Sequence, residues 1–145
     1  MVNVTIGLHV DTNTVTPKNL ETHCYFTVDG IRVTPPGGKL TDTSLNLTQL
    51  DYVTWKGIST DNDNNVVNIN SIVFVSGTNV FGTTPITGEG SPAMVEAQAV
   101  LVGDEQYTIN FDIGRVDSSM ESLILRVDPK IHVTTGSGSG GVVIE

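Results

Sequence analysis

Apolar and polar positions alternate along the start of the chain. The even positions from 2 to 10 are all apolar, and the odd positions between them are polar or glycine. A period of two is typical of a β-strand that buries one face. The same alternation returns at 107–113 and 123–127. These segments predict strands whose apolar faces share a core.

A turn signal separates two further strand-like runs, at 24–28 and 31–34. The dipeptide between them is Asp29-Gly30. This pair favours a two-residue type I′ hairpin turn, because both positions need positive φ. We therefore predict a β-hairpin here.

The middle of the chain adds more strand-like runs and one long loop. Runs rich in β-branched or aromatic residues lie at 50–59 and 66–75. Residues 77–92 form a loop by composition, with Phe81 and Ile86 expected to anchor it to the body. Residues 93–102 fit either a helix by composition or a strand by alternation, and we favour the strand.

These elements predict an all-β fold. About eight or nine short strands follow one another without a convincing helix, which is typical of a single-domain antiparallel β-sandwich of jelly-roll type. We place that domain at 1–134. Its core should contain the large apolar residues of several strands, namely Val4, Trp55, Ile109, Phe111 and Leu125.

Residues 135–145 form a Gly/Ser-rich tail with an apolar end. The apolar residues Val142, Val143 and Ile144 follow a stretch with the composition of a flexible linker. One interpretation is a disordered stub. The other is a short strand that pairs with a sheet edge, in its own subunit or in a neighbour. Pairing with a neighbour would make the protein a homo-oligomer, which we expect.

Charge and composition narrow the class of partner. The chain has 145 residues with 7 basic and 16 acidic side chains, and its net charge is −9. Scattered basic residues argue against binding to nucleic acid or an anionic membrane. No apolar run is long enough for a membrane helix, and the N-terminus lacks the pattern of a signal peptide. With Cys24 as the single cysteine, no internal disulfide is possible, so we expect a cytoplasmic protein.

The densest polar cluster is Asp-Asn-Asp-Asn-Asn at 61–65. Oxygen ligands at Asp61, Asp63 and Asn65 suit calcium, although the EF-hand pattern fails because Val66 and Ile72 replace its glycine and glutamate. The loop resembles the calcium loop of small bacterial mannose- and fucose-binding lectins. It differs from that loop in having Val66 where the lectins have Asp, and Gly57 where they have Glu. The alternative interpretation is a solvated turn.

Catalytic motifs are absent from the sequence. The histidines at positions 9, 23 and 132 are too far apart in the sequence for a typical zinc motif. We expect Cys24 to be a small buried apolar residue. No nucleophile elbow, phosphate loop or dinucleotide fingerprint occurs. Two carboxyl pairs, Asp112 with Asp117 and Asp104 with Glu105, have the residue type that glycosidases use. Aromatic residues that could bind a sugar ring are scarce, and Trp55 is expected in the core.

Four sequence blocks together resemble the PixA/AidA inclusion-body protein family of bacteria. They are IGLHVDT at 6–12, DYVTWK at 51–56, YTINF at 107–111 and DPKIHV at 128–133. The order of the blocks matches, while Val127 stands where that family has an aromatic residue. The resemblance implies a small cytoplasmic bacterial protein, stored in some members as crystalline inclusions, with no enzymatic activity to transfer.

Two functions follow from the sequence. The first is a non-enzymatic, self-assembling structural protein of inclusion-body type, with Val142–Ile144 as its assembly segment. The second is a carbohydrate-binding, lectin-like module, with calcium as a possible cofactor at 61–65. We do not expect the protein to be an enzyme, which is the least favoured of the three hypotheses.

Overall fold

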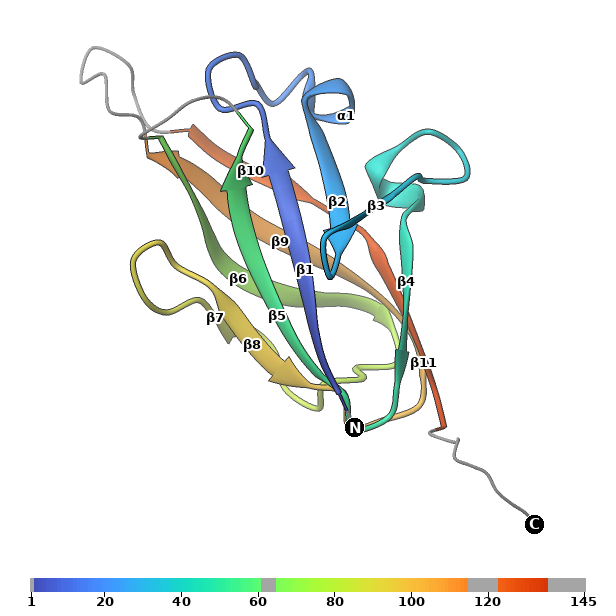
Figure 1. The fold of residues 1–145 in the computed structure, drawn as a ribbon. Helices are drawn as coiled ribbons and strands as arrows, with labels where there is room; N and C mark the ends of the chain where they lie inside the picture. Colours follow the sequence, from blue (N-terminus) through green and yellow to red (C-terminus); the bar gives the residue numbers. More distant parts are fainter. Residues whose placement is uncertain (1, 61–64, 115–122, 136–145) are drawn as a thin grey trace.

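The computed structural model describes residues 2–60, 65–114 and 123–135. Nearly all of its regular structure is β, as the sequence predicts (Figure 1). The strands are β1 (Asn3–Val10), β2 (Cys24–Val28), β3 (Ile31–Val33), β4 (Ser44–Thr48), β5 (Tyr52–Ser59), β6 (Val66–Gly77), β7 (Ile86–Thr87), β8 (Val95–Gln98), β9 (Gly103–Gly114), β10 (Leu123–Val127) and β11 (Lys130–Thr134). One helical turn, α1 (Leu20–His23), and one 3-10 turn, Leu40–Asp42, complete the elements.

The strands form two sheets. The first has the order β3-β2-β1-β5-β8, and the second has the order β4-β11-β9-β6-β7. The long strand β9 pairs with β11 along its first half and with β10 along its second half. The two shorter strands therefore lie end to end along one side of β9.

Two strand pairs correct the prediction of a purely antiparallel sandwich. β1 pairs with β5 in parallel, and β11 pairs with β4 in parallel. The all-β class is confirmed, but both sheets are mixed. The cause is topological, because β2, β3 and β4 intervene between β1 and β5, so that β5 returns to β1 in the same direction. The described strands also exceed the eight or nine expected, since short strands such as β7 lie inside segments read as loops.

Local predictions agree with the structure. Asp29 and Gly30 both have positive φ, at 51° and 86°, as a type I′ turn requires. The 93–102 segment contains strand β8 and no helix. Phe81 is buried and Ile86 is half-buried, so the 77–92 loop is anchored as expected. The single turn of α1 was not predicted.

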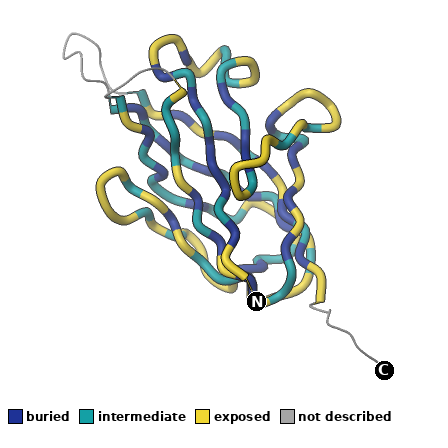
Figure 2. The backbone as a smooth tube through the Cα atoms, viewed as in Figure 1, coloured by how far each residue is buried: buried dark blue, intermediate teal, exposed yellow. Residues whose placement is uncertain are grey.

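The core lies between the two sheets. All five predicted core residues are buried within one cluster. Figure 2 shows buried and intermediate positions alternating along the strands, with the loops largely exposed. Trp55 of the first sheet donates its indole N–H to the Tyr107 hydroxyl of the second sheet at 3.2 Å, and Phe81 packs edge-on against Trp55. This cross-sheet contact is fully buried.

Close approach of the two sheets requires a glycine in β5. A Cβ atom at Gly57 would lie 2.6 Å from the Val67 carbonyl oxygen of β6. That distance is too short for a real contact, so a side chain at this position would push β5 away from β6.

Truncating Phe111 to alanine should lower the free energy of unfolding by about 3–5 kcal/mol, because the ring is fully buried between the sheets. Urea unfolding at low protein concentration measures this loss. The exposed Ile124→Ala variant on the neighbouring strand is the matched control and should change stability by less than ~0.5 kcal/mol. A loss below ~1 kcal/mol for Phe111→Ala would contradict the packing described here.

Candidate functional site

The predicted calcium ligands are only partly placed. Asp61 and Asp63 lie outside the described residues. Asn65 donates its side-chain amide to Thr12 Oγ1 at 3.1 Å and to Asn13 Oδ1 at 3.0 Å, which ties the start of β6 to the 11–14 turn. In the described part of the chain, no group of three His, Cys, Asp or Glu residues is arranged to hold a metal. The calcium site remains a prediction.

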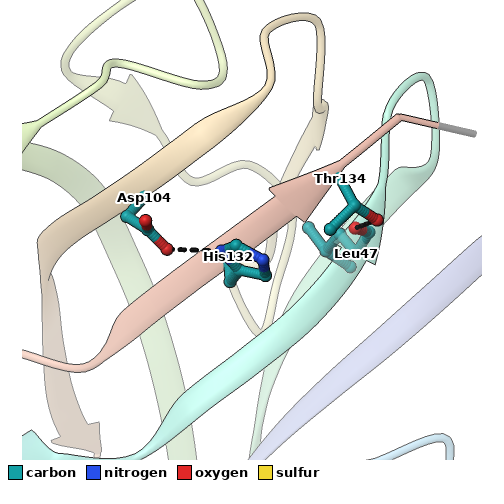
Figure 3. A network of polar contacts seen from close by, with 4 residues as sticks. All are labelled: Leu47, Asp104, His132 and Thr134. Atoms are coloured by element: carbon teal, nitrogen blue, oxygen red, sulfur yellow. Dashed lines mark hydrogen bonds and ion pairs between the residues drawn. The ribbon is translucent and has the colours of Figure 1, made fainter.

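The three histidines lie in separate places. His9 is half-buried on the outer face of the first sheet, stacked on Tyr25 with ring centroids 4.5 Å apart. His23 ends α1, where its Nδ1 lies 3.1 Å from the Asn19 carbonyl oxygen. His132 pairs with Asp104 between β11 and β9, in a solvent-exposed contact (Figure 3). They do not form a shared site, as expected from their spacing.

The carboxyl pair Asp104 and Glu105 does not form a glycosidase site. Asp104 and Glu105 are neighbours on β9, and they point to opposite sides, with Asp104 exposed and Glu105 buried. Asp112 accepts hydrogen bonds from the side-chain amides of Asn68 and Asn70, at 2.9 Å and 2.8 Å. Its proposed partner, Asp117, lies outside the described residues.

Glu105 is a buried acid with an altered pKa. Burial raises the pKa of its carboxyl to about 7, although the hydrogen bond that Oε1 accepts from the Val80 N–H, at 2.8 Å, favours the charged form. This bond fastens the 77–92 loop to β9. A single carboxyl does not supply the two groups that glycoside hydrolysis uses, so we assign Glu105 a structural role.

Cys24 is buried, as the sequence predicts. Burial raises the pKa of its thiol to about 12, and the negative charges of Glu21 and Asp11 act in the same direction. The reactive form of cysteine is the thiolate. Cys24 is therefore a core residue and not a nucleophile.

An open strand edge is the most prominent surface feature. Among the described residues, β10 pairs with β9 alone, so its other edge is unpaired. Ile124, the second residue of β10, is 81% exposed. The edge borders a groove of about 490 Å³, whose wall opposite β10 includes Pro17 and Leu20. An unpaired edge with an apolar side chain is a template for pairing with another strand.

Sequence reasoning did not single out this edge. The signal that could have found it is Ile124 itself, an isoleucine at the outward position between Leu123 and Leu125. A polar residue is expected there in a strand with one solvated face. The predicted assembly residues Val142, Val143 and Ile144 lie outside the described residues.

The fold and surface define a β-sandwich with an open apolar edge. Neither the family models nor the curated proteins contain a match to the chain. Among solved structures, it is similar to the inclusion body protein PixA of Burkholderia cenocepacia, with a TM-score of 0.62, 19% identity, and coverage of 91% of this chain and 95% of that one. The resemblance inferred from the sequence is thus confirmed at the level of the fold.

A second solved structure gives a much weaker likeness. It is the cysteine protease inhibitor EhICP2 of Entamoeba histolytica, with a TM-score of 0.32, 16% identity, and coverage of 66% of this chain and 88% of that one. A likeness at that level carries no functional argument.

The described part of the chain includes no helix with the length and apolar character that a bilayer crossing demands.

Replacing Glu105 with glutamine should remove one component of the pH dependence of stability. The folded-state pKa of about 7 exceeds the ordinary value of 4.5. The protonated carboxyl of Glu105 therefore favours the folded state fully below pH 4.5, and this contribution is lost as pH rises from there through about 7. Urea unfolding at pH 5 and pH 8 should show a smaller fall in stability for Glu105→Gln than for the unmodified chain. Equal falls in the two proteins would contradict the assignment.

Calcium should raise the melting temperature if the 61–65 loop binds it, since a ligand that binds only the folded state stabilises it. The double change Asp61→Asn with Asp63→Asn should abolish that rise, and Glu96→Gln, an exposed acid on β8, should leave it intact. Thermal melts in calcium and in EDTA measure the effect. An unchanged melting temperature would leave the loop as a turn.

Proposed function

We propose that this protein is a non-enzymatic, self-assembling protein of inclusion-body type that works in the cytoplasm. The observation that carries the proposal is the open edge of β10, with Ile124 exposed and an apolar-walled groove beside it. The fold shared with the PixA inclusion body protein supports the same function. The assembling unit is the whole chain, including its tail.

The acceptor in this proposal is the edge of β10. Strand addition at such an edge gains main-chain hydrogen bonds, while side chains on alternate positions give specificity. A strand added beside β10 would point alternate side chains into the groove lined by Pro17 and Leu20. The other alternate side chains would lie next to Ile124 and Arg126, which are both exposed and border the same groove.

The donor is the apolar end of the tail, Val142–Ile144. Its residues alternate so that Val142 and Ile144 can enter the groove together. Glu145 then falls on the outer side with Val143, where it can pair with Arg126 while Val143 covers Ile124. This charge complement favours a tail strand that runs parallel to β10.

We place the donor on a neighbouring copy. At ~3.3 Å per residue, the strands from Leu125 to Thr134 extend roughly 30 Å. Figure 1 shows β10 and the end of β11 at opposite ends of the sandwich. From Thr134 to Val142 the chain spans roughly 15 Å as a flexible coil. At this average extension the tail falls short of its own β10, which favours pairing with the β10 of another molecule.

Such an interface is head-to-tail. Each copy donates a tail to one neighbour and accepts a tail from another, so the contact produces rings if it closes and open filaments if it does not. An open series of this kind accounts for growth into large assemblies. No catalytic step is needed.

Two variants that cannot assemble alone should form a dimer, and nothing larger, when they are mixed. Deletion of 135–145 removes the donor and leaves the acceptor, whereas Ile124→Lys blocks the acceptor and leaves the donor. Light scattering should give monomers for each variant alone, one-to-one dimers for the mixture, and larger species for the unmodified chain.

The matched control is Ile31→Lys, which places the same charge on the β3 edge, where Ile31 is 75% exposed. This variant should assemble like the unmodified chain. The proposal fails if the deleted protein keeps its oligomeric mass, or if the two variants remain monomeric when mixed at high concentration.

A further inference from the structure

An opening over Gly7 lies on the outer face of the first sheet, away from the strand edges. The register aligns Thr27 of β2, Gly7 of β1 and Lys56 of β5 in one row across the sheet. Gly7 carries no side chain, so the row has a low point at its centre. A cavity of about 410 Å³ opens above it. We call this cavity, lined by Thr5, Gly7, His9, Thr27, Asp29 and Lys56, the Gly7 pocket.

Gly7 is required for the geometry of this pocket. A Cβ atom there would lie 2.6 Å from Thr27 Oγ1 and 3.2 Å from His9 Nε2. Because that atom is absent, His9 and Thr27 approach each other across the strands and form a hydrogen bond of 3.0 Å. A glycine inside a strand often marks a place where another group approaches the backbone closely.

The wall of the pocket at His9 is fixed by a stack of side chains from three strands. The His9 ring lies nearly parallel to Tyr25, at an interplanar angle of 7°. The Arg32 guanidinium of β3 lies 4.0 Å from the centroid of the same Tyr25 ring. Stacking and cation–π contact hold His9 in one orientation.

Two positive charges, those of Arg32 and Lys56, act on His9, although the whole chain has a net charge of −9. Burial lowers the pKa of His9, and the charges of Arg32 and Lys56 lower it further. The one ion pair among the described residues joins His132 and Asp104, so neither Arg32 nor Lys56 is paired with a carboxylate there. An anion would relieve this unbalanced charge.

The opposite wall presents an acceptor. Asp29 accepts the Thr5 backbone N–H on Oδ1 at 2.9 Å and lines this end of the pocket, where its carboxylate can also accept a hydrogen bond from a hydroxyl group. The Thr5 and Thr27 hydroxyls can donate or accept. The pocket therefore combines a cationic side with an acceptor side.

We propose that the Gly7 pocket binds a small hydroxylated anion, the chemistry shared by sugar phosphates and sugar acids. Its anionic group lies beside Lys56 and His9, and its hydroxyl groups bond to Asp29 and Thr27. The pocket is independent of the β10 edge, so its ligand binding does not depend on assembly.

NMR titration of the full 15N-labelled chain provides the test, at a concentration low enough to keep the chain monomeric. The probes are glucose 6-phosphate, glucuronate, inorganic phosphate and glucose, each at millimolar concentration. At least one sugar anion should shift the amides of Gly7, His9 and Lys56 and bind more tightly than glucose or inorganic phosphate. Comparing the phosphate with the glucuronate arm distinguishes the two sources of the anion.

Lys56→Gln should weaken binding about tenfold, because it removes a charged hydrogen-bond donor. Lys130→Gln, an equally exposed lysine on the second sheet, is the matched control and should bind normally. Gly7→Ala should abolish the shifts, because the added Cβ would displace Thr27 and His9 from their places in the pocket wall. If Gly7→Ala does not fold, Lys56→Gln alone decides the outcome.

Glucuronate binding should also tighten as pH falls through the lowered pKa of His9, because protonation adds positive charge to the pocket. Arg32, Tyr25, Lys56 and Asp29 are the charged or titratable groups that face His9. Glucuronate keeps its charge between pH 5 and pH 8, so the change reports on the protein. Absence of shifts with every anion, equal binding of glucose, or equal weakening by Lys130→Gln would overturn the proposal.

Discussion

The hydrogen bond between Trp55 and Tyr107 joins the two sheets at the centre of a dry core. Each group would be costly to bury without the other, because an unpaired polar atom in an apolar interior loses its hydration without replacement. Burial raises the pKa of the Tyr107 hydroxyl, and the charge of Glu105 raises it further, while the hydrogen bond from Trp55 acts in the opposite direction. The cross-sheet pair therefore fixes how the inner faces align, and Gly57 allows the backbones to approach closely enough for it to form.

This packing buries the apolar inner faces of the two sheets. The strand edges and the outer faces stay exposed. β10 keeps one edge unpaired among the described residues, and a second copy of the chain is the proposed remedy. On the outer face of the first sheet, the absence of a side chain at Gly7 lets His9 and Thr27 meet, and Lys56 and Asp29 line the pocket beside them. One sandwich thus carries two independent features, an edge suited to assembly and a pocket suited to a small anion. The net charge of −9 opposes close contact between copies, so salt should favour assembly.

Local patterns predicted the strands well, because alternation and turn chemistry are properties of neighbouring residues. The Asp29-Gly30 turn and the buried faces of β1 and β9 follow from them directly. The parallel pairing of β1 with β5 did not, since strand order depends on contacts between distant segments. The Gly7 pocket was missed for the same reason, as only that pairing brings Lys56 beside Gly7. The composition of the polar 61–65 cluster predicted a calcium site, and its two aspartates fall outside the described residues.

Hydrogen exchange at the β10 amides tests the central claim of strand-mediated assembly most directly. The measurement compares the full chain, at low and high concentration, with the chain lacking 135–145. The account predicts that amides within 123–127 gain protection at high concentration in the full chain only, because a neighbouring tail pairs with the open edge. Equal protection in both chains at every concentration would contradict it.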